Sequence, residues 1–403
     1  MGERPLWVQI VTILAVLIVL VALTIANYRF SEELPGGNDF LARWMGARYW
    51  VQEGISPYDA EVSLATQELI YGRPADAEVG EDSAHFVYPF PSMLFFAPFG
   101  ALPYTLARAI WMTILEISLP LLALIGIAIA DWKPRRAVLI SLLLFSVLWY
   151  HGMRAVIVGQ FAVIEALLMA GALLAIKRNG DALGGILLGL SIVKPQMAVL
   201  LIPFVFLWAG WARRWTIVVW GVGTIGLLTA VSVLLLPDWP IMWMRQLLEY
   251  PTYTDLGPPV SILADALPSL STVIALVLGG ALILYLFWEW AKAMGKPDRW
   301  FQWTAALTIV ITNLVAFRTA TTNYVVLLPV LCLIFSVLAE RWGRKGDFVI
   351  LLAMAAILLG MWGLFLATVE GNIESPIMYL PLPILTLIGL WWARWWAIRA
   401  VRL

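Results

Sequence analysis

The chain has 403 residues, of which 62% are hydrophobic and only 13% charged, and its formal net charge is zero. A soluble domain of this composition could not cover its own surface with polar groups, so the sequence excludes a soluble protein. The charge balance gives no indication of a nucleic-acid partner. The single cysteine, Cys332, lies inside an apolar run and is interpreted as a small hydrophobic residue, not as part of a disulfide or metal cluster.

The first apolar run, from Trp7 to Ala26, predicts a retained membrane span. It is too long for a signal-peptide core, and no cleavage site of small residues follows it. Later apolar runs predict an all-α polytopic membrane protein with about 12 transmembrane helices. The expected spans are 7–26, 104–130, 137–153, 160–176, 182–193, 196–210, 215–237, 269–291, 299–317, 322–338, 347–369 and 376–396. The spans 182–193 and 196–210 are too short to cross alone and are expected to be half-depth helices around "VKPQ".

The distribution of charge predicts the orientation in the membrane. Most of the 26 Lys and Arg residues fall in short turns on the side of the N-terminus, whereas most carboxylates fall on the other side. The positive-inside rule then puts both termini in the cytoplasm. We expect one integral membrane domain over residues 1–403 of a multi-pass protein in the plasma (inner) membrane. Its large extracytoplasmic loops are 27–103 and 238–268, so chemistry is expected on the extracytoplasmic face.

The first of these loops opens with "PGGNDFLARWMGARYW", residues 35–50. Residues 35–37 are typical of a turn, Asn38 of a helix N-cap, and the pattern predicts a helix from Asp39 to Gly54. Its apolar face, formed by Phe40, Leu41, Trp44, Met45, Ala47 and Val51, predicts an amphipathic helix lying in the membrane interface. A second helix is expected over about 60–71, after "SPYD".

Asp39 would lie at the N-terminus of this interfacial helix, where two effects on its carboxyl group compete. The helix dipole favours the ionised form by about 0.3–1 kcal/mol, whereas partial burial near lipid disfavours that form. A carboxylate in this position suits a general base. The alternative is an ordinary helix-terminal carboxylate on the surface, and position alone does not separate the two. The segment 85–103 that ends the loop has four prolines and predicts a packed re-entrant connector, which is favoured over a catalytic role for His85.

Several ionisable residues are expected at membrane depth, where a charge usually faces a cavity or a partner. Lys194, in "LSIVKPQMAV", is the clearest functional candidate because Pro195 breaks the helix beside it and a buried cation needs an anion. For Arg108 and Arg154, an interface anchor is at least as good an interpretation as a functional role. Glu165 either pairs with an outer-face Arg or lines a cavity, and the same two interpretations apply to Glu116. His151 is interpreted as a packing residue. No metal-ligand spacing and no Ser–His–Asp arrangement stands out.

The order of several short motifs resembles a known family. These are "GGNDF" with "SPYD", "F.YPFP", "GQ" at 159–160, "GGILLGLSIVKPQ" and "NYVVLLPVL", spread over about residues 25–335. In this order they resemble glycosyltransferase family 87, polyprenyl-phosphate-mannose-dependent mannosyltransferases of the GT-C superfold.

The resemblance implies inverting transfer of a sugar, mannose in the family, from a polyprenyl-monophosphate donor to a hydroxyl group on a lipid or glycolipid. It implies that Asp39 is the general base and that Lys194 contacts the donor phosphate, with Arg318 as a second candidate. Cations can stabilise a departing phosphate, so no metal and no cofactor beyond the donor substrate is expected. The expected partners are membrane lipids, the donor and the acceptor, and we expect a monomer.

Weaker candidates for substrate binding are Arg43, Tyr58, His85, Tyr88, Gln160, Asn323 and Tyr324. The chain departs from some relatives where a histidine is expected near the active site, because the sequence there reads "TATTNY". Two alternatives remain at this point: a flippase or transporter for a lipid-linked sugar, and a polymerase or ligase that uses polyprenyl-diphosphate glycans.

Overall fold

The computed structural model describes residues 5–34, 36–76, 81–250, 257–263, 270–317, 320–371 and 374–399. Over these residues the chain is helical and contains no strand, which confirms the all-α fold class. Seven helices are long and apolar enough to cross a membrane, or eight if a bent pair counts as one span. The protein is therefore a polytopic membrane protein, whereas the expected number of about 12 spans is not confirmed.

Contacts divide the chain into two compact units. The first comprises Met1–Val87, Met93–Ile117 and Val156–Gln160, and the second comprises Tyr88–Ser92, Ser118–Ala155 and Phe161–Leu403. The helices of the first unit are α1 (Leu6–Glu33), α2 (Asn38–Glu53), α3 (Ala60–Tyr71), α4 (Met93–Gly100) and the beginning of α5 (Tyr104–Ile129).

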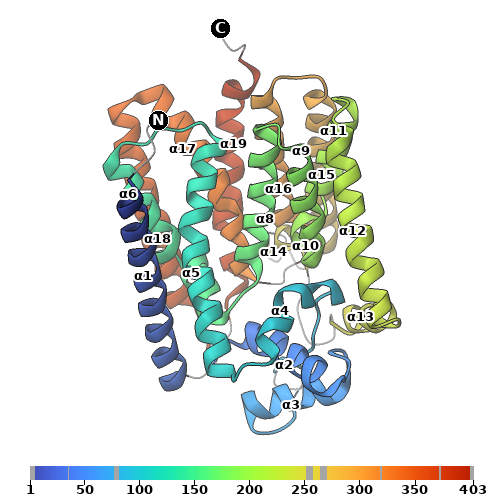
Figure 1. The fold of residues 1–403 in the computed structure, drawn as a ribbon. Helices are drawn as coiled ribbons and strands as arrows, with labels where there is room; N and C mark the ends of the chain where they lie inside the picture. Colours follow the sequence, from blue (N-terminus) through green and yellow to red (C-terminus); the bar gives the residue numbers. More distant parts are fainter. Residues whose placement is uncertain are drawn as a thin grey trace. The chain divides into compact units, whose positions relative to one another are not determined.

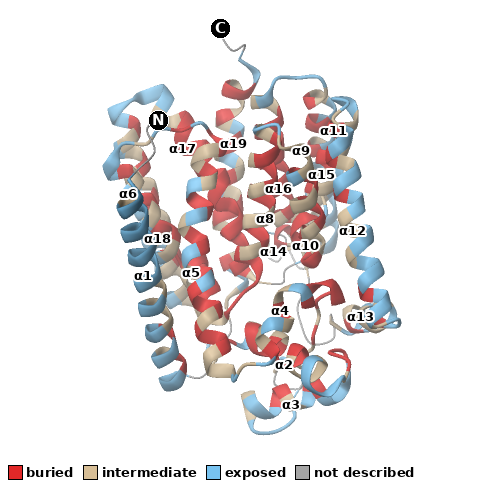
Figure 2. Ribbon diagram, viewed as in Figure 1, coloured by how far each residue is buried: buried red, intermediate tan, exposed pale blue. Residues whose placement is uncertain are grey.

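In the first unit, α1 exposes almost its whole surface (Figure 2) and contacts α5 through a few polar groups. The amide of Asn27 donates to the hydroxyl of Thr113 at 3.1 Å and to the carboxylate of Glu116 at 2.9 Å. Interhelical hydrogen bonds of this kind hold membrane helices together, since lipid tails offer no competing partner. Glu116 therefore has a structural partner.

The helix α2 confirms the expected apolar face but not what covers it. Phe40, Leu41 and Trp44 are buried against protein, because α2 packs on α4 and the Trp44 indole donates to the carbonyls of Phe99 and Leu102, each at 3.1 Å. Val51, the last residue of that face, is 46% exposed. The amphipathic pattern thus reflects a protein core, and the membrane-interface location stays a prediction. Gly54 ends the helix in the left-handed region, as expected, and α3 matches the expected 60–71.

The loop after α3 is closed by a surface ion pair. The Arg73 guanidinium donates to both carboxylate oxygens of Glu81, at 2.8 and 2.9 Å, and these hydrogen bonds hold the pKa of Glu81 below its usual range. After the loop, the proline-rich segment forms only η2 (Phe90–Ser92) and the eight-residue α4, which confirms that it is not one continuous helix.

The second unit is a helical bundle (Figure 1). After η2 it continues with α6 (Arg136–Leu148), α7 (Tyr150–Val158), α8 (Ala162–Lys177), α9 (Asp181–Leu190), η3 (Ser191–Val193), α10 (Pro195–Ala198), α11 (Leu201–Trp211), α12 (Trp215–Leu235), α13 (Trp239–Glu249), α14 (Pro259–Ile262), α15 (Ser271–Ala293), α16 (Asp298–Val315), η6 (Thr321–Leu327), α17 (Leu328–Trp342), α18 (Arg344–Thr368), η7 (Pro376–Tyr379) and α19 (Pro381–Ile398). Helices α8, α16 and α17 are mostly buried in this bundle, whereas α12 and α15 expose most of their surface (Figure 2).

In the second unit one predicted span is broken, and one predicted loop contains a helix. The expected span 137–153 is broken at Trp149 into α6 and α7, which meet at an angle of 43°. The indole of Trp149 is completely buried, and apolarity alone carried no signal for this bend. The predicted 238–268 segment contains the 11-residue helix α13.

Candidate active site

The turn before α2 fixes the position of Asp39. Gly37 adopts φ +76°, and its carbonyl accepts the backbone N–H groups of Phe40 and Leu41, both at 2.8 Å. The helix begins at Asn38, one residue earlier than predicted, and the expected side-chain cap from Asn38 is wrong: Gly37 is the N-cap and no side chain caps the helix. Asp39 therefore lies in the first turn of α2 and is half-buried.

Buried side chains hold this turn from outside the helix. The Arg108 guanidinium donates to the Leu34 carbonyl at 2.7 Å and to the Ile157 carbonyl at 3.4 Å, and the Tyr104 hydroxyl donates to the carbonyl of Gly36. Arg108 is only 2% exposed. Arg108 therefore links the end of α1 to the end of α7. This geometry fits neither of the two roles considered for it, an interface anchor or a functional contact.

Phe40, the residue after Asp39, fixes the same turn from its other side. Its side chain is fully buried and stacks on Trp111 with the ring centroids 5.3 Å apart. The Trp111 indole in turn donates to the carbonyl of Gly159 at 2.9 Å. Asp39 therefore projects from a rigid frame, which is what a general base needs.

Replacing Gly37 by Ala tests this frame. A Cβ at Gly37 would lie 2.7 Å from Nε of Arg108 and 3.0 Å from the Tyr104 hydroxyl, in a backbone region that costs about 1–2 kcal/mol for an L-residue. We expect sugar transfer to fall about 10-fold or more, because displacing a positioned group by about 1 Å can cost 10²-fold.

The control for Gly37→Ala is Gly54→Ala at the other end of the same helix. Gly54 has φ +69°, and a Cβ there would meet nothing within 4 Å. Both variants carry the same backbone strain, so only the crowding at Arg108 differs. Initial rates and melting temperatures of both proteins check the prediction; equal losses of transfer in the two variants would show that the turn does not position the reacting group.

Two of the remaining candidates in the first unit, Tyr58 and His85, have structural contacts. Tyr58 is buried edge-on against Phe86, with the ring centroids 5.6 Å apart, and burial raises the pKa of its hydroxyl. Nδ1 of His85 lies 2.8 Å from the Ser63 hydroxyl, which favours the connector interpretation. Arg43 is half-buried one turn after Asp39, and Gln160 is buried.

In the second unit, Lys194 lies at a break between short helices. α9 and η3 precede it, Pro195 begins α10 after it, and Lys194 itself has non-helical dihedral angles, φ −128° and ψ 71°. The glycine-rich motif explains the close approach of α9 to α12: a Cβ at Gly185 would lie 2.4 Å from the carbonyl oxygen of Ile217. Short helices thus flank "VKPQ" as expected, but the expected 196–210 is divided into α10 and α11, and the depth of these helices in the membrane stays a prediction.

The Lys194 side chain is buried, with 2% of its surface exposed. Its ammonium lies 5.7 Å from the centroid of the Tyr88 ring, within the range of a cation–π interaction. Tyr88, predicted as a substrate contact, is buried and packs edge-on against Phe161. The structure therefore brings Lys194 and Tyr88 together.

Glu165 on α8 is the acidic group that accompanies Lys194. It is completely buried, and neither carboxylate oxygen has a hydrogen-bond partner within the described residues. The cation acting on it is Lys194, whereas the sequence suggested an outer-face Arg or a cavity position. Ser191 also acts on the carboxylate, while its hydroxyl donates to the carbonyl of Leu187 at 3.1 Å.

A second polar cluster of this unit was not predicted. The Glu374 carboxylate accepts hydrogen bonds from the Tyr150 hydroxyl and from the Thr321 hydroxyl, the latter at 2.6 Å, and lies 3.7 Å from the Arg154 guanidinium. Arg154 is thus part of a structural ion pair. His151 packs among the rings of Trp149, Tyr150 and Tyr324, as the packing interpretation predicted. No sequence signal marks Glu374, because its partners are far from it in the chain.

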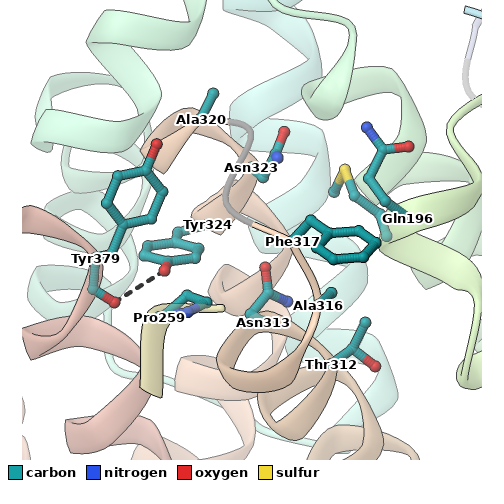
Figure 3. Close-up of a pocket in the computed structure, with 11 residues that line it drawn as sticks. Gln196, Pro259, Thr312, Asn313, Ala316, Phe317, Ala320, Asn323, Tyr324 and Tyr379 are labelled. Atoms are coloured by element: carbon teal, nitrogen blue, oxygen red, sulfur yellow. Dashed lines mark hydrogen bonds between the residues drawn. The ribbon is translucent and has the colours of Figure 1, made fainter. Parts of the chain in front are cut away.

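Asn323 and Tyr324 are buried in η6, and the Tyr324 hydroxyl donates to the carbonyl of Tyr379 at 2.8 Å (Figure 3). Arg318, the second predicted phosphate contact, lies outside the described residues. Asp39, Arg43, Tyr58, His85 and Gln160 belong to the first unit, and Lys194, Tyr88, Asn323 and Tyr324 to the second. Within the described ranges, no three His, Cys, Asp or Glu side chains are grouped to hold a metal ion.

Comparison with known proteins gives one match. No curated protein sequence and no solved structure matches the chain. The family model of glycosyltransferase family 87 matches residues 86–254, a shorter range than the 25–335 over which the motifs extend. The matched range contains Tyr88, Gln160 and Lys194, whereas Asp39 and Asn323 lie outside it. The match agrees with the family that the motifs predict, over residues 86–254 of this membrane protein, and it supports a glycosyltransferase.

Proposed function

We propose that the protein transfers mannose from a polyprenyl-monophosphate donor to a hydroxyl group of a lipid or glycolipid, with inversion at the anomeric carbon. The observation that carries the proposal is the rigid placement of a half-buried Asp39 in the first turn of α2. A fixed carboxylate at a helix N-terminus is poised to accept a proton.

The reaction is a single displacement. Asp39 takes the proton of the acceptor hydroxyl, the hydroxyl oxygen attacks C1 of the sugar, and the bond between C1 and the phosphate oxygen breaks. The bonding electrons leave with the polyprenyl phosphate, whose negative charge grows as it departs. A buried ammonium stabilises such a charge more strongly than a solvated one, and Lys194 has this burial.

The proposal also covers location and partners. The reaction takes place on the extracytoplasmic face of the plasma (inner) membrane, with both chain termini in the cytoplasm, as the distribution of Lys and Arg predicts. Donor and acceptor reach the protein through the membrane, and the protein works as a monomer without a cofactor.

Donor choice tests the proposal. Purified protein in detergent is given radiolabelled mannose on polyprenyl monophosphate or on polyprenyl diphosphate, with a lipid extract of the source cells as acceptor. We expect labelled product from the monophosphate only. Product from the diphosphate alone would instead support a polymerase or ligase. Movement of the donor across liposomes without any product would support a flippase.

A further inference from the structure

An open hollow lies at one end of the helical bundle, where α17 and α19 end beside each other (Figure 1). Its volume is about 640 Å³, within the range of small-molecule sites. The described residues that line it are Glu340, Arg341, Trp395 and Arg399. Both helices belong to candidate membrane spans, which end at Trp342 and Ile398. The hollow therefore lies where the hydrocarbon gives way to the lipid headgroups.

The guanidinium group of Arg341 is held by aromatic rings. It lies 5.4 Å from the centroid of the Trp392 ring and 5.2 Å from that of Trp395, within the range of cation–π interactions. The planes of these two rings are 84° apart, so they support the guanidinium from two directions. Arg341 forms no ion pair with any described residue. Since its donors lie in the plane of the group, stacking leaves N–H edges for a ligand.

The described lining carries more positive than negative charge. Arg399, the C-cap of α19, is exposed and also forms no ion pair within the described part of the chain. Against the two guanidinium groups stands the carboxylate of Glu340, whose Oε2 accepts the indole N–H of Trp396 at 2.9 Å. The C-terminal ends of two helices disfavour an anion at this place, so anion binding depends on the two arginines.

Exposed apolar side chains adjoin these charges. Trp342, directly after Arg341, is exposed and packs against Trp392 with the ring centroids 5.6 Å apart. Trp391, one turn before Trp395, and Ile398, directly before Arg399, are exposed as well. Indoles at the end of a membrane span lie at the level of the headgroups. A ligand that carries both an anionic group and acyl chains matches this combination, whereas a soluble phosphate ester matches the charges alone.

We propose that the hollow binds the headgroup of an anionic glycerophospholipid from the adjoining leaflet. The phosphate oxygens accept hydrogen bonds from Arg341 and Arg399, because the planar fork of a guanidinium fits two phosphate oxygens at once. The acyl chains lie against the exposed apolar side chains of α17 and α19. The excess of positive charge favours an anionic lipid over a zwitterionic one, whose own cation the arginines repel. This site has no part in the proposed sugar transfer.

The test measures lipid binding to the purified protein in detergent by native mass spectrometry, with dioctanoyl phosphatidylglycerol and dioctanoyl phosphatidylcholine as probes. We expect phosphatidylglycerol to bind more tightly. Arg341→Gln and Arg399→Gln should each weaken its binding about 5-fold, the usual contribution of one basic residue near anionic lipid. Arg344→Gln is the matched control: this exposed arginine begins α18 and is not among the described lining residues. Its loss should leave the affinity unchanged.

Two further variants separate a directed contact from diffuse charge. Glu340→Gln keeps an acceptor oxygen for Trp396 but removes the negative charge, so it should tighten phosphatidylglycerol about 5-fold. Arg399→Lys keeps the positive charge but loses the planar fork, and it should weaken binding. If Arg399→Lys binds like the wild type and Arg344→Gln weakens binding as much as Arg399→Gln, the effect comes from net charge and the proposed site is wrong.

Other occupants give distinct results. Binding of glycerol 3-phosphate as tight as that of phosphatidylglycerol would assign the hollow to a soluble phosphate ester and overturn the lipid proposal. Equal affinity for the two lipids would overturn the preference for an anionic headgroup. Weaker binding in Arg402→Gln but not in Arg399→Gln would assign the lipid to the chain end, outside the described residues. Lower melting temperatures of the two arginine variants, with unchanged lipid affinity, would show that these arginines only stabilise the helix ends.

Discussion

Replacing Asp39 by Asn is expected to lower the rate of sugar transfer by about 10²–10⁴-fold without unfolding the protein. The amide has the same size but cannot accept the proton of the acceptor hydroxyl. The fold should survive because the turn is held by Gly37, Arg108 and the buried Phe40, while loss of a carboxylate from the first turn costs only about 0.3–1 kcal/mol. Turnover with radiolabelled polyprenyl-phosphate-mannose and melting in detergent are the measurements.

The control is Asp59→Asn, the same change at the start of the neighbouring helix α3. Asp59 is exposed and caps α3 without a side-chain hydrogen bond, so both transfer and melting should remain close to wild type. Equal rates of transfer by wild type and Asp39→Asn would show that the protein is an enzyme but that Asp39 is not its general base. A folded Asp39→Asn protein that retains donor binding but not turnover would localise the defect to the proton-transfer step.

Replacing Lys194 by Met is expected to lower the free energy of unfolding by about 1–3 kcal/mol, because the buried Glu165 carboxylate then loses the cation that acts on it. Adding Glu165→Gln removes that charge and should restore most of the stability. Transfer should stay about 10²–10³-fold below wild type in the double variant, since a cation that stabilises a departing phosphate is still absent.

This double-mutant cycle separates a structural ion pair from a substrate contact. Lys177→Met serves as a comparison, and its loss of stability should be milder because its partner Asp131 is 81% exposed and can be solvated. Stability is followed by thermal unfolding in detergent and function by turnover. Recovery of both stability and transfer in the double variant would show that Lys194 and Glu165 serve only the fold.

Local features were predictable where their causes are local. The ends of α2 and α3 follow from glycines whose left-handed conformations stop a helix, and the break at Lys194 follows from Pro195. The covering of α2 was not predictable, because an amphipathic helix has the same pattern whether lipid or α4 covers its apolar face.

The partners of buried charged residues could not be predicted from the sequence, because they lie far away in the chain. Arg108 holds the carbonyls of Leu34 and Ile157, and backbone acceptors distant in the chain leave no trace in a sequence pattern. The same is true of Glu165, whose cation Lys194 comes from the break between η3 and α10. Of the candidate residues, Lys194 was recognisable because a lysine in an apolar run demands an explanation.

The short helices before Lys194 also set how far a lipid-linked headgroup must travel. α9 begins at Asp181, which forms a half-buried ion pair with Arg214, and the proposed orientation puts this charged end at the cytoplasmic membrane surface. Ten residues of α9 and three of η3 rise by about 15 and 6 Å. In the proposed orientation this would leave Lys194 about 10 Å short of the opposite side of a hydrocarbon layer about 30 Å thick. A phosphate that reaches this ammonium must descend below the level of its neighbouring headgroups, while its isoprenoid chain stays in the hydrocarbon. Local thinning of the bilayer around α9 would shorten that descent, which couples the reaction to membrane thickness.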